Sequence, residues 1–273
     1  MADIKAADVS KLRKATGAGM MDCKKALVEA EGDFDKAIEL IRKKGQAVAS
    51  KRAEREATEG VVLAKTAGKK GAIIILNCET DFVAKNQDFI DFASKILDIA
   101  LDKLPADLDT LKALTFDDGK TIADKVTEQV GIIGEKIELG DYDKIEAEDV
   151  VSYIHPGNKL ATIVGFTRAV ETQVGKDVAM QVAAMSPVAV DKDDVPEDII
   201  EKEKEIGRDQ ARAEGKPDNI VDKIAEGKLN KFFKENTLLN QAFTKDNKIS
   251  VAQYLKQADP ELNVTGFVRF QLG

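Results

Sequence analysis

The stretch that decides the fold is VVLAKTAGKKGAIIILNC, residues 61–78. Two runs rich in β-branched and other apolar residues, Val61–Thr66 and Ala72–Cys78, flank the segment Ala67–Gly71. β-Branched residues favour strands and glycines favour tight turns, so this pattern predicts a β-hairpin. Asn86 then follows as a candidate helix cap, with apolar residues at helical spacing behind it. We therefore expect a hairpin followed by an amphipathic helix.

The same order of elements recurs later in the chain. Two β-prone runs, Val150–Ile154 and Leu160–Phe166, flank residues 155–159, and a helical stretch that ends at Ser186-Pro187 follows them. This recurrence, about ninety residues further on, predicts two related α+β units in one core, with little residue identity between the copies. Val264–Leu272 alternates apolar and polar side chains, and we place this closing strand beside the second hairpin.

The first part of the chain predicts three short helices. Apolar residues recur at helical spacing in each helix, Gly17 and Gly32 follow the first two, and Asp33 can cap the third. We expect Gly45 to lie beyond the end of the third helix. Helices this short are marginal alone, so they are expected to pack on one another as a small bundle. Residues 46–59 are rich in Ala, Lys, Arg and Glu and predict a separate linker helix.

The charged segment Pro196–Leu229 has a different pattern. Ile199, Ile206 and Ala213 are spaced by seven residues, and a Gly-Lys-Pro turn at 215–217 follows them. This pattern predicts two antiparallel helices joined by a turn. A hairpin this thin buries little apolar surface alone, so we expect it to meet a partner or a second copy.

The fold class that follows is α+β, and a chain of 273 residues is long enough for two or three compact units. The expected division is an N-terminal helical bundle with its linker helix at 1–55, one core subdomain at 56–140, a second at 141–190 and 230–273, and a protruding helical hairpin at 191–229.

Composition and charge predict a protein of the cytosol. The N-terminus has no apolar segment typical of a secretory signal, and no apolar run approaches the ~20 residues of a membrane span. Cys23 and Cys78 are therefore expected to be buried, reduced thiols. The net charge of -8 argues against nucleic-acid binding. We interpret the basic stretch Lys43–Arg55, which acidic residues interrupt, as a solvated helix face.

A search for catalytic chemistry finds no candidate. His155 is the one histidine, and nothing near it resembles an activated nucleophile, so we interpret it as a surface contact. The few Cys and His residues are scattered, which excludes an ordinary zinc site. The glycines at 17 and 19 lack both the preceding strand and the last glycine of a dinucleotide loop, and no phosphate-binding P-loop occurs. We expect a binding protein with no catalytic residue, cofactor or metal.

The segment between the predicted hairpin and the Asn86 cap is the candidate binding tip. Asp81 and Phe82 lie where a loop would turn from strand to helix. The pattern leaves two alternatives open for Phe82, an exposed partner contact or a plug that folds back into the core. Met20 and Met21 are adjacent, so a helix can hardly bury both, and we expect one in the core and the other in a partner contact.

Three segments of the chain resemble a known family, the bacterial translation elongation factor Ts family. TGAGMMDCKKAL at residues 16–27 is similar to its N-terminal signature, NCETDFVA at 77–84 to its second signature, and VTGFVRF at 264–270 to its closing strand. Their order and spacing fit along the whole chain. The resemblance implies a guanine nucleotide exchange factor for elongation factor Tu, a GTPase that delivers aminoacyl-tRNA to the ribosome. It also implies that the N-terminal bundle is ubiquitin-associated-like.

The resemblance also implies roles for individual residues. Phe82 is the wedge that inserts between two helices of the GTPase, Asp81 lies beside it, and Thr80 to Val83 together displace the magnesium ion of the GTPase. Further partner contacts are implied at Met20, Met21, Lys24 and His155. The hairpin of residues 191–229 matches a module that pairs two copies in some members, which adds a homodimer to the expected partners. No nucleic acid and no membrane are expected as partners.

The chain also departs from the family pattern. We take Val126–Val130 as the equivalent of a common Ile-Gly-Glu-Asn-Ile stretch, and the missing glycine there puts backbone contacts in question. Gln181 replaces a frequent histidine, which we expect to alter packing only. The chain stops at Gly273, without the C-terminal helical module of some members.

The alternative function is an adaptor or scaffold that binds Tu or another protein without changing nucleotide exchange. A hydrolase or metalloenzyme is the third possible class of function.

Overall fold

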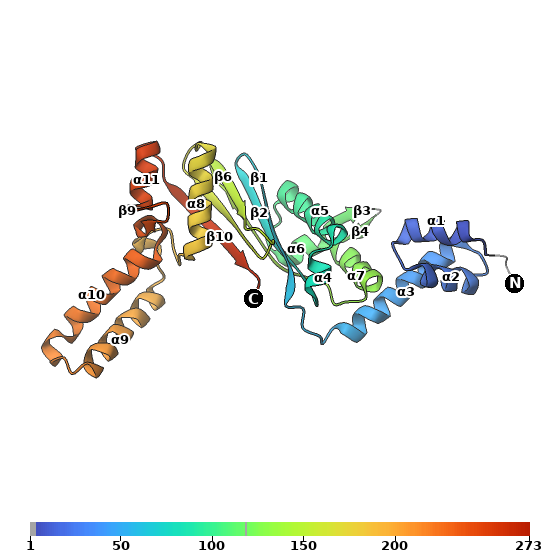
Figure 1. Ribbon diagram of the computed structural model, residues 1–273, viewed down its shortest axis with the longest axis horizontal. Helices are drawn as coiled ribbons and strands as arrows, with labels where there is room; N and C mark the ends of the chain where they lie inside the picture. Colours follow the sequence, from blue (N-terminus) through green and yellow to red (C-terminus); the bar gives the residue numbers. More distant parts are fainter. Residues whose placement is uncertain (1–3, 118) are drawn as a thin grey trace. The chain divides into compact units, whose positions relative to one another are not determined.

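Helices and strands are mixed along the chain in a computed structural model that describes residues 4–117 and 119–273 (Figure 1). The mixture, with helices at the N-terminus, fits the predicted α+β class. The described residues form two compact units. The first comprises Met1–Leu63, Ile74–Asp143 and Gln271–Gly273 as far as they are described, and the second comprises Ala64–Ile73 and Lys144–Phe270.

Three N-terminal helices share one apolar cluster, as predicted. They are α1 (Ala6–Thr16), α2 (Met20–Glu29) and α3 (Phe34–Arg52). Gly17 ends α1 in the left-handed region at φ 70°, where a residue without Cβ is favoured. The Asp33 carboxylate caps α3 by accepting from the backbone N–H groups of its first turn. The buried members of the cluster are Val9, Leu12, Ala18, Cys23, Ala26, Leu27, Ala30 and Ala37.

The third helix is longer than predicted. It continues through Gly45 to Arg52, so Gly45 is not beyond its end and there is no separate linker helix at 46–59. The physical reason is a close helix crossing with α7 (Ile122–Ile133). A Cβ built on Gly131 of α7 would lie 2.4 Å from the Gly45 Cα, so the backbones touch where neither residue has a side chain. Gly45 serves this approach and does not stop the helix.

The first predicted hairpin is confirmed. Strands β1 (Glu59–Ala67) and β2 (Lys70–Cys78) are neighbours in a three-stranded sheet that β5 (Glu138–Glu146) completes in the order β1-β2-β5. The Asn86 side chain caps α5 (Gln87–Lys103) by accepting from the Asp88 N–H, as expected. Between α5 and α7 lie α6 (Leu108–Ala113) and the paired short strands β3 (Thr115–Asp117) and β4 (Lys120–Thr121).

The second hairpin and the closing strand are confirmed as well. Strand β6 (Asp149–Ile154) pairs antiparallel with β7 (Leu160–Phe166), and β10 (Val264–Gln271) lies on the other side of β7. The helix that follows, α8 (Thr172–Met185), ends at Ser186, which has φ 44°. Buried side chains of β7, α8 and the C-terminal region form one core cluster.

The C-terminal half also contains the predicted pair of helices. They are α9 (Glu197–Ala213) and α10 (Asp218–Asn236), so the second helix continues beyond Leu229. Several short elements are not predicted from the sequence. The 3-10 helix η1 (Lys192–Asp194) precedes α9, and the 3-10 helix η2 (Leu238–Asn240), β8 (Ala242–Phe243), β9 (Asp246–Ser250) and α11 (Val251–Ala258) follow α10.

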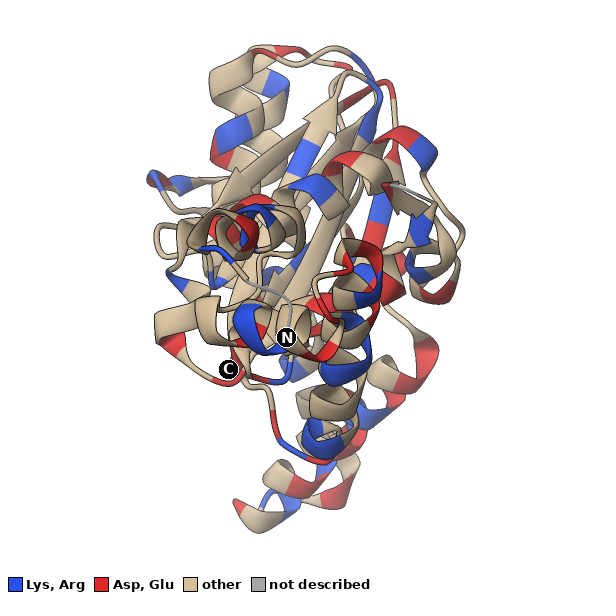
Figure 2. Ribbon diagram, turned by 90° about the vertical axis from the view of Figure 1, so that its right-hand side faces the viewer, with Lys and Arg blue, Asp and Glu red and all other residues tan. Residues whose placement is uncertain are grey.

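Charge is distributed over the helices without separation by sign. Acidic and basic residues lie interspersed along the ribbon in Figure 2. No helix in the described part of the chain combines the length and the apolar character needed to cross a bilayer.

The crossing of α3 and α7 predicts an asymmetric response to two alanine substitutions. Gly131→Ala would place a methyl carbon 2.4 Å from the Gly45 Cα, so we expect it to lower the free energy of unfolding by about 1–3 kcal/mol. Gly45→Ala is the matched control, because its methyl carbon would lie 3.5 Å from the Gly131 Cα and alanine favours helix by up to about 1 kcal/mol. Urea denaturation measures both variants, and equal effects would contradict this contact.

Candidate functional site

The candidate tip forms a single short helix, α4 (Asp81–Ala84), directly after β2. Thr80 is its cap, and the Thr80 Oγ1 accepts from the Val83 N–H at 3.4 Å. Phe82 is 83 % exposed, whereas Ala84 is buried. The alternative that Phe82 plugs the core is therefore wrong. The remaining alternative is an apolar ring presented to solvent, which is typical of a contact surface.

Asp81 and Val83 frame this ring. The Asp81 carboxylate forms an ion pair with Lys85 one turn later, with Oδ2 and Nζ 2.6 Å apart. Both side chains are largely accessible to water, so this pair adds little stability. Val83 of the same helix is half-buried. Thr80 to Val83 thus combine a capping hydroxyl, a charged carboxylate and an exposed aromatic ring.

A carboxylate from a distant segment holds the backbone before the tip. Glu135 Oε2 accepts from the N–H groups of Glu79 and Thr80 at 3.1 and 3.0 Å, and its Oε1 accepts from the Thr80 hydroxyl at 2.7 Å. Gly134, in the left-handed region at φ 80°, ends α7 and turns the chain into Glu135. Three donors on one carboxylate define the direction in which the chain leaves β2.

The Glu79 carboxylate in turn holds the backbone beside Glu135. Glu79 Oε1 accepts from Arg52 at 2.7 Å and from the Lys136 N–H at 2.6 Å, and its Oε2 accepts from Arg55 at 3.0 Å. Burial alone would raise the pKa of Glu79, but the Lys136 N–H and the two guanidinium groups outweigh burial and lower that pKa to about 2. Each glutamate therefore accepts from the backbone beside the other. We call these two residues the carboxylate clamp.

The thiol of Cys78 lies behind the same backbone. Its Sγ is 3.2 Å from the Thr80 carbonyl oxygen, to which it donates. Burial, and next the negative charge of Glu135, raise the pKa of Cys78 to about 12, so the thiol stays protonated. Cys23 and Cys78 are both buried and free of disulfides, as predicted.

The clamp corrects two sequence-based predictions. The stretch Lys43–Arg55 is not simply a solvated face, because Arg52 is partly buried against Glu79. Val126–Val130 lies inside α7 and is the wrong equivalent of the family stretch. Ile133-Gly134-Glu135-Lys136-Ile137 matches that stretch in four of five residues and contains the glycine. This match was the signal in the sequence that could have found Glu135.

The other predicted contacts in the first unit lie together on α2. Lys24 is exposed, and Met20 and Met21 are 53 % and 64 % exposed, so the prediction that one methionine is in the core is wrong. The reason is that the buried stripe of α2 begins only at Cys23, after both methionines. Val28 of the same helix is also exposed.

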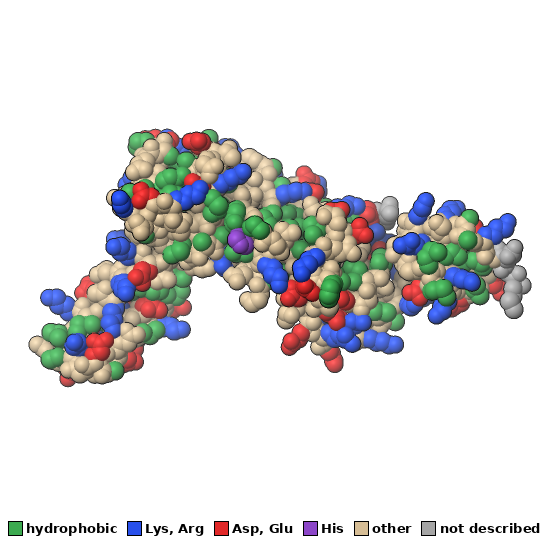
Figure 3. Space-filling view, viewed as in Figure 1, with side chains coloured by type: hydrophobic (Ala, Val, Ile, Leu, Met, Phe, Trp, Pro, Cys, Tyr) green, Lys and Arg blue, Asp and Glu red, His purple; other side chains and the backbone are tan. Residues whose placement is uncertain are grey.

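His155 belongs to the second unit. It is exposed in the turn between β6 and β7, and its side chain is purple in Figure 3. Its Nδ1 lies 2.9 Å from the Tyr153 hydroxyl, which holds the imidazole ring at the turn. Among the described residues, no group of three or more His, Cys, Asp and Glu side chains is placed to hold a metal ion.

Gln181 does more than fill space, contrary to the prediction that it alters packing only. It is fully buried in α8, and its amide nitrogen donates to the Gln241 Oε1 and to the Ala242 carbonyl oxygen. Its Oε1 accepts from the Thr244 N–H at 2.9 Å. The amide thus ties α8 to the segment that leads into β8 and β9, through bonds whose loss would leave buried polar groups unsatisfied.

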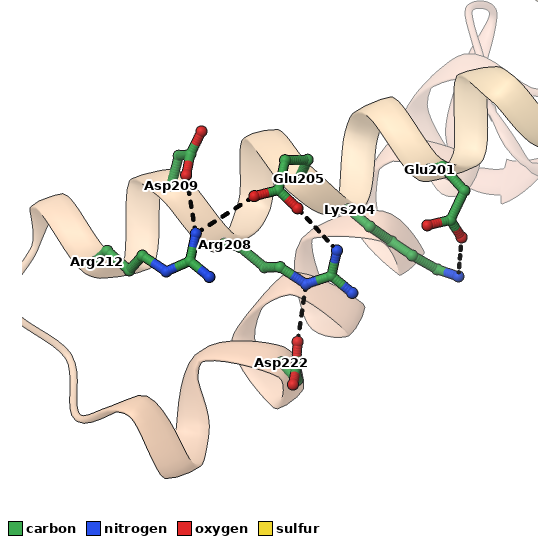
Figure 4. A network of polar contacts seen from close by, with 7 residues as sticks. All are labelled: Glu201, Lys204, Glu205, Arg208, Asp209, Arg212 and Asp222. Atoms are coloured by element: carbon green, nitrogen blue, oxygen red, sulfur yellow. Dashed lines mark hydrogen bonds and ion pairs between the residues drawn. The ribbon is translucent and has the colours of Figure 1, made fainter.

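The helical hairpin is joined by ion pairs on its surface (Figure 4). Arg208 Nε of α9 lies 2.8 Å from Asp222 Oδ1 of α10, and Arg208 also pairs with Glu205 within α9. The remaining pairs drawn are Arg212 with Glu205 and Asp209, and Lys204 with Glu201. Beneath them α9 and α10 approach closely, since a Cβ on Gly207 would lie 3.0 Å from the Ala225 Cα. Ile206 and Ile220 remain exposed.

Comparison with known proteins identifies the family. A family model described as elongation factor TS matches residues 79–273. The chain is 54 % identical to elongation factor Ts of Porphyromonas gingivalis (strain W83) over 97 % of both chains. It belongs to the elongation factor Ts family. Elongation factor Ts of Christiangramia forsetii is 56 % identical and that of Chlorobium phaeobacteroides 47 %, each over the full length of both chains.

Family membership confirms the resemblance and makes the chain a translation elongation factor that takes part in protein biosynthesis. The part matched by the elongation factor TS model begins at Glu79, so it contains the tip, the carboxylate clamp and His155. The N-terminal helices lie outside that match but inside the region aligned with the relatives.

The low pKa of Glu79 predicts a pH-dependent contribution to stability. Because this pKa is about 2 in the folded chain and ordinarily 4.5, charged Glu79 stabilises the fold above about pH 4.5, and this contribution is lost as the pH falls toward 2. We expect Glu79→Gln to lower the free energy of unfolding at pH 7 and to lose this effect near pH 2. Urea denaturation at several pH values tests this, with Glu56→Gln as an exposed control, and a difference that does not depend on pH would contradict it.

Proposed function

We propose that the chain is a guanine nucleotide exchange factor for elongation factor Tu and accelerates the release of GDP from it in the cytoplasm. The single observation that carries the proposal is Phe82, a ring 83 % exposed on a short helix whose backbone is held by hydrogen bonds. Membership of the elongation factor Ts family supports the choice of partner.

In this proposal Thr80 to Val83 act as a wedge. Phe82 inserts between two helices of the GTPase, and Asp81 lies beside it at the partner surface. In GTPases the bound magnesium bridges phosphate oxygens and protein side chains and neutralises phosphate charge. Displacement of this ion or of the phosphate-binding loop removes that neutralisation, so GDP dissociates faster. The magnesium is the partner's ion, and the wedge needs no acid, base or nucleophile of its own.

The direction of the effect follows from differential affinity. A factor that binds nucleotide-free Tu more tightly than GDP-bound Tu shifts the equilibrium toward the empty state. Bound GDP must then weaken the binding of the factor by the same ratio, because the coupling free energy is reciprocal. A chain that bound both states equally would form a complex without exchange.

Additional contacts serve to hold the GTPase while the wedge acts. We propose that Met20, Met21 and Lys24 on α2 contact the nucleotide-binding domain of Tu. The exposed methionines suit this role, because their flexible thioether side chains adapt to a partner surface. His155 at the β6–β7 turn would contact a more distal domain of Tu.

The domain organisation that we propose is the one expected from the sequence. A ubiquitin-associated-like bundle with the following residues occupies 1–55, two related core subdomains occupy 56–140 and 141–190 with 230–273, and a protruding antiparallel hairpin occupies 191–229. The recurrence of hairpin and helix, β1–β2 with α5 and β6–β7 with α8, supports the relation between the subdomains.

We also propose that the α9–α10 hairpin pairs two copies of the chain. The hairpin is thin and leaves Ile206 and Ile220 exposed, and a second copy would cover them.

The wedge proposal predicts the effect of one substitution. Phe82→Ala should slow factor-stimulated GDP release from Tu by about thirtyfold or more, since truncation of an aromatic hot spot costs about 2 kcal/mol or more. The ring is exposed, so the variant should fold normally. Stopped-flow measurement with labelled GDP tests this, with Val188→Ala, another exposed apolar residue, as the control.

The same experiment separates the exchange factor from an adaptor or scaffold. An adaptor would bind Tu, or another protein, without accelerating GDP release. Complex formation by the unaltered chain with unchanged release kinetics would favour the adaptor. Rapid release that Phe82→Ala leaves unaltered would instead refute the wedge.

Pairing through the hairpin predicts concentration-dependent sedimentation. The chain should sediment as a dimer at high concentration, and Ile206→Asp combined with Ile220→Asp should shift it to the monomer, because buried unpaired charges oppose association. Analytical ultracentrifugation of both proteins, alone and with Tu, measures this. A single monomeric species of the unaltered chain at every concentration would exclude the pairing.

A further inference from the structure

We infer that Glu135 and Glu79, the carboxylate clamp, are positioning residues that fix the direction in which Phe82 is presented to the GTPase. The inference rests on the proposed function and extends it, because it concerns residues outside the Thr80–Val83 tip.

The tip cannot hold its own conformation. Helix α4 has four residues, and a helix this short is far below the length that is stable alone in water. The Phe82 ring is exposed, so it has little packing that would restrain it. The direction of the Phe82 Cα–Cβ bond must therefore come from the backbone of residues 79–81 and from the cap.

Glu135 supplies this restraint through three hydrogen bonds to two consecutive residues. It accepts from both backbone N–H groups that precede α4 and from the Thr80 hydroxyl. The hydroxyl proton points toward Glu135, so the oxygen lone pairs of Thr80 are left to accept from the Val83 N–H. The clamp thus sets the cap, and the cap sets the turn on which Phe82 lies.

Glu79 connects this arrangement to two long helices. Its carboxylate accepts from Arg52, the last residue of α3, and from the Lys136 N–H, in the segment that follows α7. The same two helices touch through Gly45 and Gly131. The backbone before the tip is therefore connected by hydrogen bonds to the ends of α3 and α7. Helix α3 also contributes to the cluster of the N-terminal helices.

A preorganised tip backbone raises the exchange rate for a physical reason. Association loses the conformational freedom of every group that becomes ordered, and this loss weakens binding. A tip already held in its bound orientation avoids part of this loss. Without the clamp, the wedge would still be present but would have to order its backbone on binding.

A double-mutant cycle tests the clamp. Glu135→Ala should slow stimulated GDP release by about three- to tenfold in the unaltered chain, the range expected when one group that was held in place has to become ordered on binding. In the Phe82→Ala background the same substitution should slow release by little more, because Glu135 acts through Phe82. Glu138→Ala is the matched control, an exposed glutamate three residues further on that pairs with the Lys136 ammonium.

Amide hydrogen exchange supplies a readout independent of Tu. Glu135→Ala should accelerate exchange of the Glu79, Thr80 and Val83 amides, while the amides of β1 and β2 keep their protection. Glu79→Gln is the second variant, and its amide effect should appear at Lys136. Loss of protection across the whole first unit would show a general folding defect and overturn a positioning role.

The kinetic outcomes distinguish the wedge role of Phe82 from the positioning role of the carboxylate clamp. If Phe82→Ala slows release and Glu135→Ala slows it by the same further factor in both backgrounds, the wedge stands and the clamp inference is wrong. The inference would also be overturned if the Glu135→Ala variant stimulated GDP release at the wild-type rate although its tip amides exchanged hydrogen faster. If Phe82→Ala itself leaves the accelerated release unchanged, the proposed wedge fails, and the positioning role fails with it.

Discussion

The contact between Gly45 and Gly131 is the constraint on which the architecture of the first unit depends. Because neither residue has a side chain, α3 and α7 approach until their backbones touch. This crossing brings the end of α3, with Arg52, and the segment after α7, with Glu135, to the point where β2 leaves the sheet. An apolar interface with larger side chains would separate the helices and withdraw the donors and acceptors that surround Glu79 and Thr80.

The site combines a restrained backbone with an unrestrained side chain. Hydrogen bonds to charged groups are each worth about 1.5–3 kcal/mol, so the restraint is concentrated in a few strong interactions. Phe82 contributes no comparable stability to the free chain, since its ring remains in water. The ring is left accessible to a partner surface. The exposed ring is therefore not needed for the fold of the chain.

The sequence predicted the elements whose signals are local. Asn86 and Asp33 are identified as caps because capping needs only neighbouring residues. Both hairpins follow from β-prone runs that flank a short turn segment, and the closing strand follows from its alternating pattern. The failures concern signals that depend on distant residues. The local pattern predicts a helix end at Gly45, because its partner Gly131 lies on another helix. Glu135 was missed because its three donors lie more than fifty residues away in the chain. For Phe82 the pattern leaves a partner contact and a core plug open, because the burial of its ring also depends on distant residues.

The reciprocal bonds of Glu79 and Glu135 have a consequence for the evolution of such chains. Each carboxylate satisfies backbone N–H groups beside the other, so a change at one position leaves the other beside unsatisfied donors or with a charge that has lost part of its surroundings. A single replacement should therefore be tolerated less well than replacement of both residues together. We expect positions 79 and 135 to vary together among related chains, with Arg52 as the counter-charge of Glu79.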